Sequence, residues 1–365
     1  MFGGVLMSIN HGANLYNLSS KYGLSKEDFM DFSSNINPLG TSTLAKQYII
    51  DNIDMVSIYP DPEYLNLKKS ISDYCNCLDR NILLGSGATE LISSFIKTIN
   101  PKNALLLSPA YSEYERELNK ISCNIIKYFS LKEKDFRIDV SELIHNINNN
   151  KYDLIVICNP NNPTGFTFTK SEIKEILNST NAYIMVDETY VEFTDMSIYS
   201  STSLVDDYSN LFVIRGTSKF FSTPGIRLGY GLTSDRIIQE KINSNFDLWN
   251  INIFASTMGE IMFTDRDFIN MTAKVILKER DFLIEKLNSL SGIHVYNSQG
   301  NFILCEITSK VMTANTLRES LLNYRIIIRD CSSFNGLDEY FFRVCVLKPE
   351  ENRLLIDSLI KIFKE

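Results

Sequence analysis

The chain has 365 residues, of which 44% are apolar and 22% charged, and this ordinary globular composition excludes a long disordered or collagen-like chain. Its 36 basic and 44 acidic residues give a formal net charge of −8, which argues against nucleic acid and anionic membranes as partners. There is no apolar run of about 18 residues, so we expect no membrane-spanning helix. The first seven residues lack the pattern of a secretory signal, so we expect a cytoplasmic protein of about two domains.

The cysteines and histidines show no spacing typical of a metal or redox site. Cys75 and Cys77 are the only close pair among seven cysteines, and one intervening residue is too few for the usual motifs. His11, His145 and His294 are far apart in the sequence. We therefore expect reduced thiols, and the sequence indicates no metal.

Short apolar runs alternate with amphipathic helical stretches through the first two thirds of the chain. Runs that end in Gly, Pro or Asn are typical of strands buried on both faces, and they fall at 81–84, 104–107, 154–158, 183–186 and 211–214. The apolar spacing over 91–99 is that of one helix face. This alternation predicts an α/β fold with a mostly parallel sheet between helices.

The remainder of the chain has a different pattern. A long helix is predicted over 265–290, strands over 302–307, 325–329 and 341–346, and a last helix over 350–363. This order indicates a smaller α+β domain. We expect an N-terminal arm (1–44) that joins the small domain, a large domain (45–255) and a small C-terminal domain (256–365).

Four of the predicted strands run into polar segments, at 85–90, 159–165, 187–190 and 215–219. In open α/β sheets, ligands bind at the carboxyl ends of the strands, so in a parallel sheet these segments share one edge. Gly85-Ser86-Gly87-Ala88-Thr89 precedes a helix and could bind an anion, although a plain tight turn explains it equally well. It is neither a Walker A loop nor a complete dinucleotide fingerprint, which disfavours a nicotinamide dehydrogenase.

Two of these strand ends carry a group with a specific chemical use. A lysine at a buried strand end, such as Lys219, can lose its proton and act as an amine nucleophile. Asp187 ends an apolar strand and needs a cationic partner, which a protonated pyridine nitrogen would supply. The alternative for Lys219 is a solvated surface charge, and the alternative for Asp187 is a helix N-cap.

Three of these motifs together resemble a known family. Asn-Pro-Asn-Asn-Pro-Thr-Gly at 159–165, Asp-Glu-Thr-Tyr at 187–190 and Ser-Lys at 218–219 with Arg227 eight residues on resemble the fold-type I pyridoxal-phosphate enzymes of the class I/II aminotransferase branch. The resemblance implies pyridoxal 5′-phosphate as cofactor, with a large sheet that has seven strands. It implies that Lys219 forms the Schiff base and that Asp187 faces the pyridine nitrogen.

The same resemblance assigns the other cofactor residues. Asn162 and Tyr190 would hold the ring's 3′-oxygen, and Tyr111 would stack on the ring, although a lone tyrosine is usually a core residue. The remaining implied cofactor contacts, most of them to the phosphate, are Gly87, Ala88, Thr89, Ser218 and Arg227. A binding module without turnover is disfavoured because Lys219 is present.

The two ends of the chain resemble a narrower group. The segments 11–14, 31–40, 328–337 and 342–344 resemble threonine-phosphate decarboxylases of cobalamin synthesis, with the histidinol-phosphate aminotransferases as near relatives. The resemblance implies that Arg343 clamps a carboxylate and Arg329 a phosphate. His11 and Asn35 or Asn37 would help Arg329 to bind the phosphate. The alternative for the two arginines is that they are charges on an exposed strand surface.

The resemblance leaves the reaction and the assembly as expectations. Loss of carbon dioxide from threonine phosphate, giving aminopropanol phosphate, is the expected reaction. Transamination of histidinol phosphate with glutamate or 2-oxoglutarate is the alternative, because the same residues serve both. Tyr59-Pro60-Asp61-Pro62 resembles a loop whose tyrosine reaches the cofactor phosphate of a neighbouring subunit, which implies a homodimer with shared sites.

Overall fold

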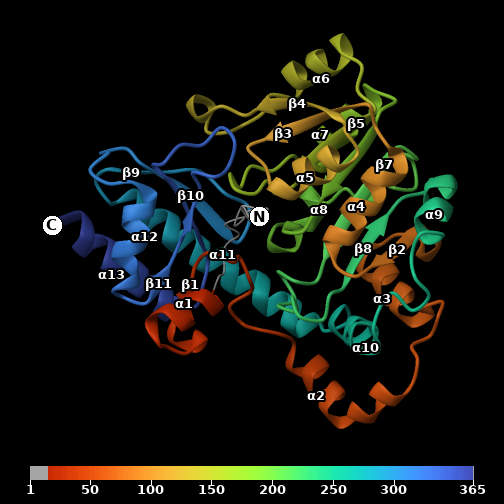
Figure 1. Cartoon of the computed structure of the whole chain (residues 1–365), viewed down its shortest axis with the longest axis horizontal. Helices are drawn as coiled ribbons and strands as arrows, with labels where there is room; N and C mark the ends of the chain where they lie inside the picture. The colour runs from red at the N-terminus through yellow and green to blue at the C-terminus, as the bar shows by residue number, and fades with distance from the viewer. Residues whose placement is uncertain (1–14, 365) are drawn as a thin grey trace, which may run out of the picture.

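The structure, a computed structural model, describes residues 15–364. Its largest feature is a seven-stranded sheet with the order β2-β8-β7-β6-β5-β3-β4 (Figure 1). β8 is antiparallel to both of its neighbours, and the other pairings are parallel. The strands are β2 (Ile82–Gly85), β3 (Asn103–Ser108), β4 (Asn124–Phe129), β5 (Leu154–Cys158), β6 (Tyr183–Asp187), β7 (Leu211–Gly216) and β8 (Gly229–Leu232). Since β2 is antiparallel to β8 and β8 to β7, the carboxyl ends of β2, β5, β6 and β7 lie on one edge, as expected.

Two strands of this sheet, β4 and β8, are not among the strands predicted from the sequence. β4 is an edge strand whose side chains are half-buried or exposed, so it lacks the apolar run that marks its neighbours. β8 has the sequence Gly-Tyr-Gly-Leu, and glycine is unfavourable in strands unless another group approaches closely. Such groups are present, because a Cβ at Gly231 would lie 2.6 Å from the Phe212 ring.

Helices cover both faces of the large sheet. The side chains of each strand alternate between two cores, so that Leu105 and Ile155 face one and Leu106 and Val156 face the other. The second core is completed by α4 (Ala88–Ile99), α5 (Ser112–Lys120) and α9 (Arg236–Asn243), and the first by α3 (Leu65–Cys75), α6 (Val140–Asn149) and α7 (Lys170–Asn178). This three-layer arrangement is the predicted α/β fold.

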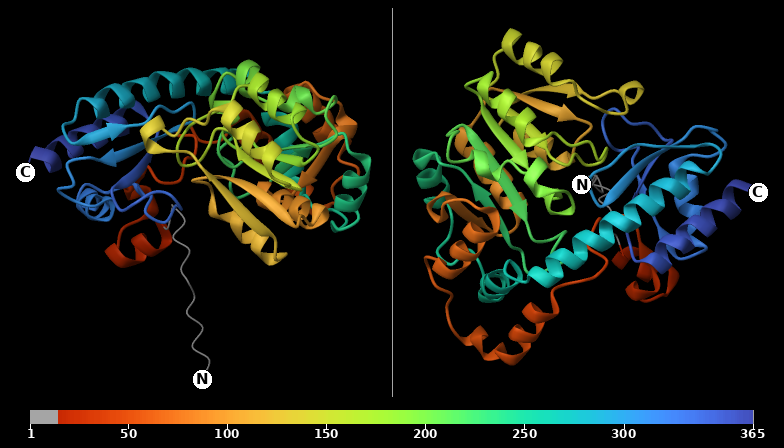
Figure 2. Two further views of the ribbon diagram at one scale, coloured as in Figure 1. Left: turned by 90° about the horizontal axis from the view of Figure 1, so that it is seen from above. Right: turned by 180° about the vertical axis from the view of Figure 1, so that it is seen from behind.

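A smaller four-stranded antiparallel sheet lies beside the large one, with the order β12-β13-β10-β9. The elements of this region are β9 (Ile293–Val295), β10 (Phe302–Ile307), β12 (Arg329–Asp330), β13 (Phe341–Cys345), α12 (Ala314–Leu322) and α13 (Pro349–Lys364). The long helix α11 (Arg266–Asn288) runs from the large sheet to the small one (Figure 2). The segment predicted as one strand over 325–329 is divided, because Ile328 separates β11 from β12.

The N-terminal part crosses to the small sheet region. β1 (Met30–Asp31) pairs in parallel with β11 (Ile326–Ile327), and α1 (Leu15–Tyr22) lies close to it in Figure 1. The chain then returns to the large sheet through α2 (Thr43–Asp51), which packs on α10 (Ile253–Met262). This crossing places residues 33–36 between the two sheet regions, where Ser33, Ser34 and Ile36 border the cavity described below.

The remaining elements are short: α8 (Met196–Tyr199) and the 3-10 helices η1 (Lys26–Asp28), η2 (Ile53–Ser57), η3 (Asp79–Asn81), η4 (Lys132–Lys134), η5 (Val191–Phe193) and η6 (Thr202–Leu204). Within residues 15–364, no helix has both the length and the apolar character needed to cross a membrane. All seven cysteines are unpaired, and six of them are buried.

Candidate active site

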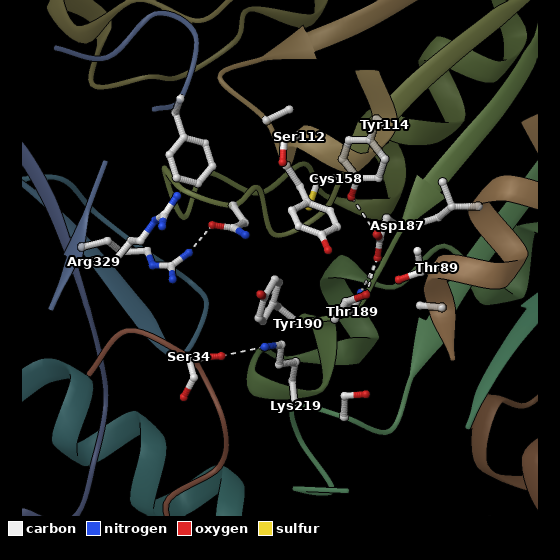
Figure 3. A pocket seen from close by; sticks show the side chains of 18 of the residues that line it. Ser34, Thr89, Ser112, Tyr114, Cys158, Asp187, Thr189, Tyr190, Lys219 and Arg329 are labelled. Carbon is white, nitrogen blue, oxygen red and sulfur yellow. Dashed lines mark hydrogen bonds between the residues drawn. The ribbon is translucent and has the colours of Figure 1, made fainter. Parts of the chain in front are cut away.

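A cavity of about 420 Å³ lies at the carboxyl edge of the large sheet, facing the small sheet (Figure 3). Its wall combines the strand ends with segments of the N-terminal arm and of the small sheet region. Of the residues implied by the resemblance, the cavity brings together Ala88, Thr89, Tyr111, Asn162, Asp187, Tyr190, Ser218, Lys219, Arg227, Arg329 and Arg343. These side chains come from positions more than 250 residues apart in the sequence, and the sheet topology explains why they meet.

Lys219 follows β7 and extends into the cavity (Figure 3). Its Nζ donates a hydrogen bond to the Ser34 carbonyl oxygen at 2.6 Å. Burial, with a further contribution from the nearby Arg343 charge, lowers the pKa of Lys219 to about 8. The lowered pKa increases the neutral fraction of this amine near physiological pH, and the neutral amine is the form that acts as a nucleophile or base.

Asp187 is the last residue of β6 and is almost completely buried. Its Oδ1 accepts hydrogen bonds from the Thr189 N–H at 2.9 Å and from the Thr189 hydroxyl, and its Oδ2 accepts one from the Tyr114 hydroxyl at 2.6 Å. Burial raises its pKa, and these hydrogen bonds oppose the rise. No cation of residues 15–364 forms an ion pair with Asp187, so the carboxylate fits a cationic group of a bound ligand.

The first turn of α4 forms one end of the cavity. Gly87 precedes this helix with a φ of 88°, and no side chain caps the helix. The guanidinium of Arg227 lies beside Gly87, because a Cβ there would lie only 2.3 Å from its Nη2. Ser218 also lines the cavity. A helix N-terminus with an adjacent arginine and a hydroxyl fits a phosphate group.

The middle of the cavity is lined by side chains suited to a flat ring with polar substituents. Tyr111 packs edge-on against Tyr114, with ring centroids 5.7 Å apart. The Tyr190 hydroxyl accepts a hydrogen bond from Asn35 Nδ2 at 3.4 Å. Burial raises the pKa of the Tyr190 hydroxyl, so it remains a hydrogen-bond donor. The Oδ1 of Asn162 is held by Arg343.

Two arginines form the side of the cavity that faces the small sheet. Arg329 on β12 and Arg343 on β13 stand directly opposite each other in the strand register. Arg343 is buried and donates from Nη2 to the Ser33 carbonyl oxygen at 2.7 Å, while Arg329 donates to the Ser333 hydroxyl at 2.8 Å. The two guanidinium groups thus offer neighbouring positive charges to an anionic substrate.

Several implied residues occupy other places. The Asn37 amide is buried away from the cavity and donates to the Phe220 carbonyl and the Thr272 hydroxyl. Asn35 does not line the cavity but contacts Tyr190, which does. Tyr59 is 76% exposed and stacks on Trp249 at 4.3 Å, away from the cavity of the described chain. His11 lies outside the described residues.

Other lining residues were not anticipated from the sequence. Tyr114 and Thr189 contact Asp187, Ser34 holds Lys219, and Cys158 lies beside Asp187 in the strand register. A signal for Tyr114 exists, because it is three residues after Tyr111 at the start of a helix and so shares its face. No local pattern marks Ser34, whose contribution is a backbone oxygen.

These features define a class of enzyme. An anion site, a lysine with a lowered pKa and a buried carboxylate that needs a cation surround one cavity, and this combination fits the phosphate, the aldehyde and the pyridine nitrogen of pyridoxal 5′-phosphate. Comparison with known proteins agrees, since residues 27–359 match the family described as aminotransferase class I and II. The chain belongs to this family of pyridoxal-phosphate-dependent enzymes.

Individual relatives carry two different names. The chain is 36% identical over 360 residues to a protein of Caldanaerobacter subterraneus described as a candidate threonine-phosphate decarboxylase, covering 97% of this chain and 94% of that one. It is 32% identical to a histidinol-phosphate aminotransferase of Methanosphaera stadtmanae, covering 96% and 95%. It is also 33% identical to the bifunctional adenosylcobalamin biosynthesis protein CobDQ of Leptospira interrogans, but it spans 41% of that protein.

Solved structures have the same fold. The histidinol-phosphate aminotransferase of Clostridium acetobutylicum superposes with a TM-score of 0.85 at 34% identity, covering 91% of this chain and 98% of that one. The L-threonine-O-3-phosphate decarboxylase of Porphyromonas gingivalis superposes with a TM-score of 0.80 at 23% identity, covering 92% and 99%, a likeness that concerns the fold. The predicted fold class is thereby confirmed.

Proposed function

We propose that this enzyme is a threonine-phosphate decarboxylase that releases carbon dioxide and forms aminopropanol phosphate. The observation that carries the proposal is the pair Arg329 and Arg343, directly opposite on neighbouring strands and both lining the cavity. Threonine phosphate has two anionic groups, a carboxylate and a phosphate, and each needs a cation when it leaves water. Histidinol phosphate has one anionic group.

The roles of the residues follow from their positions. Arg343 would bind the α-carboxylate, and Arg329, aided by His11, the substrate phosphate. We assign Lys219 as the covalent anchor of pyridoxal phosphate, whose protonated ring withdraws electrons from the substrate α-carbon. Arg343 and Arg329 would orient the carboxylate for its loss as carbon dioxide. The Nζ of Lys219 can then supply the proton that replaces the carboxylate.

The remaining contacts would fix the cofactor. We assign Asp187 to the pyridine nitrogen, Asn162 and Tyr190 to the ring's 3′-oxygen, and Tyr111 to the ring face. The phosphate would lie at the first turn of α4. Arg343 hydrogen-bonds to Asn162 and Ser33, and these bonds would have to open when a carboxylate binds.

Transamination of histidinol phosphate is the second candidate. It is supported by the 34% identity and the TM-score of 0.85 to the aminotransferase of Clostridium acetobutylicum. Such an enzyme needs one arginine that serves glutamate and the phosphate in turn, and a place for an imidazole ring. The buried, hydrogen-bonded Arg343 and the second arginine opposite it favour the substrate with two anions.

The experiment is a paired assay of the purified holoenzyme. We expect threonine phosphate to release one carbon dioxide per molecule consumed, with no keto acid present. Arg329→Gln and Arg343→Gln should each reduce kcat/KM by roughly a hundredfold, since a desolvated anion loses its charged partner. Formation of glutamate from 2-oxoglutarate with histidinol phosphate, without release of carbon dioxide from threonine phosphate, would establish the second candidate.

We further propose a cytoplasmic homodimer. Exposed apolar side chains gather on α2, η2 and the segment after them, namely Leu44, Ile50, Ile53, Val56, Ile58, Tyr59 and Leu65. An apolar surface of this kind marks an interaction site, and two-fold pairing through it would let Tyr59 reach the phosphate end of the partner's cavity. The seven unpaired cysteines support a reducing compartment.

A further inference from the structure

The hydrogen bonds that Asp187 accepts can be compared with the number that a carboxylate is able to accept. An ionised carboxylate has about four acceptor positions, two on each oxygen. The N–H and the hydroxyl of Thr189 occupy both positions on Oδ1. The Tyr114 hydroxyl occupies one position on Oδ2, at 2.6 Å, so the donors within residues 15–364 leave one further position on Oδ2.

We propose that Tyr114 is a positioning residue for the cofactor: its hydroxyl holds Asp187 ionised and aims the one vacant acceptor position of Oδ2 at the pyridine nitrogen. The inference rests on the proposed contact between Asp187 and that nitrogen, and not on which substrate the enzyme uses. Tyr114 belongs to α5, whereas Asp187 belongs to β6, so the contact joins a covering helix to the catalytic edge of the sheet.

The electrostatic surroundings explain why such a donor is needed. Burial alone favours the neutral acid, and a neutral Asp187 could not keep the ring nitrogen protonated. A hydroxyl that donates to a carboxylate favours its charged form. The Tyr114 hydroxyl keeps its own proton, because burial and the Asp187 charge raise its pKa well above the ordinary value. It therefore acts as a donor at any working pH.

The other titratable groups near Asp187 do not replace this donor. Burial raises the pKa of each one, to about 12 for Tyr111 and Cys158 and to about 7 for Glu192, and upward for Tyr190. The Cys158 thiol donates to the Pro160 carbonyl oxygen at 3.2 Å instead. None of the four provides a positive charge, so the ionisation of Asp187 depends on Tyr114, on Thr189 and on the bound cofactor.

Tyr114→Phe tests the role because it removes one oxygen and keeps the buried ring. Thr189→Val removes the second hydroxyl and keeps the backbone N–H. Tyr74→Phe is the matched control, since Tyr74 is also buried but its hydroxyl has no hydrogen-bond partner within residues 15–364. Asp187→Asn removes the carboxylate charge and tests the contact on which the inference rests.

The measurement is the nitrogen NMR signal of isotopically labelled pyridoxal phosphate bound to each protein, with urea unfolding to verify the fold. We expect a protonated ring nitrogen in the unaltered enzyme and in Tyr74→Phe. The signal should move toward the unprotonated position in Tyr114→Phe and Thr189→Val, and furthest in Asp187→Asn. The Tyr114→Phe enzyme should also lose activity by roughly tenfold or more, as expected for one hydrogen bond to a charged group.

Two results would overturn the inference, and only the second would also refute the contact between Asp187 and the cofactor ring. An unchanged signal in folded Tyr114→Phe, together with a displaced signal in Asp187→Asn, would refute the role of Tyr114 alone. An unchanged signal in both proteins would refute the contact between Asp187 and the ring. Neither result depends on whether threonine phosphate or histidinol phosphate is the substrate.

Discussion

At the scale of single residues, the site contains buried ionisable groups, and burial shifts the pKa of each toward its neutral form. Lys219 has a lowered pKa, of about 8, and Asp187 has a raised one. Both shifts have desolvation as their largest cause, and the charge of Arg343 adds to the first. Such opposed shifts in one cavity are typical of catalytic sites, which agrees with the proposed roles of Lys219 and Asp187.

The pKa of Lys219 gives a test in the cofactor-free protein. A lowered pKa means that the amine loses its proton as the pH rises through about 8 rather than near the ordinary value of 10.5, so the rate of reaction with the aldehyde of pyridoxal phosphate should rise through the same range. Arg343→Gln should move this midpoint to higher pH, since a nearby positive charge is lost. Stopped-flow absorbance measures the rate.

Arg329→Gln serves as the comparison for that test, because Arg329 is not among the charges that act on Lys219. It should leave the midpoint close to that of the unaltered protein. A midpoint near 10.5 in the unaltered protein would contradict the proposed state of Lys219.

At the scale of the elements, close packing between β8 and the first turn of α4 fixes the anion site. A Cβ at Gly229 would lie 2.5 Å from the Ala88 nitrogen and 2.6 Å from the Gly87 carbonyl carbon. Backbone atoms cannot move aside as a flexible side chain can. Gly229 therefore admits the α4 turn, as Gly231 admits the Phe212 ring, and these two glycines are the reason that β8 lacks an apolar signature.

Gly229→Ala should displace the first turn of α4. We expect a loss of about 1–3 kcal/mol in the free energy of unfolding, as in other overpacked sites, and weaker binding of inorganic phosphate to the cofactor-free protein. Gly225→Ala is the control, because within residues 15–364 no heavy atom beyond the two chain neighbours lies within 4 Å of a Cβ built there. It should change stability by less than about 0.5 kcal/mol. Urea unfolding and phosphate titration measure the two effects.

Much of this layout could be predicted from the sequence, and the parts that could not have physical reasons. The apolar runs before Asp187 and Lys219 predicted their strands because those strands are buried on both faces. The edge strand β4 and the glycine-rich strand β8 were not predicted, because their stability depends on the strands and helices that pack against them. The contacts Lys219–Ser34 and Asp187–Tyr114 join residues 185 and 73 positions apart, and no local periodicity encodes them.

At the scale of the whole molecule, the chain crosses repeatedly between its two larger sheets. The N-terminal arm pairs with β11 beside the small sheet and then supplies the Ser34 oxygen to Lys219 on the large one. Arg343 likewise reaches from the small sheet to Asn162 on the large one. Because both sheet regions contribute to one cavity, a change in their relative position would alter the site as a unit.

The proposed homodimer is also a property of the whole molecule. Sedimentation equilibrium should give a dimer, and Ile50→Asp or Val56→Asp should raise its dissociation constant at least about tenfold, since a charge would enter an apolar interface. Val311→Asp is the control, because Val311 is equally exposed but lies in the small sheet region. A fully active enzyme that remains monomeric at all concentrations would refute shared active sites.

The central claim is that this cavity holds pyridoxal phosphate on Lys219, and chemical reduction tests it most directly. The holoenzyme should be yellow, and treatment with borohydride followed by peptide mapping should find the reduced cofactor on one peptide that contains Lys219. Lys219→Ala should bind the cofactor without fixing it. A label on any other lysine, or a protein that takes up no pyridoxal phosphate, would contradict the account.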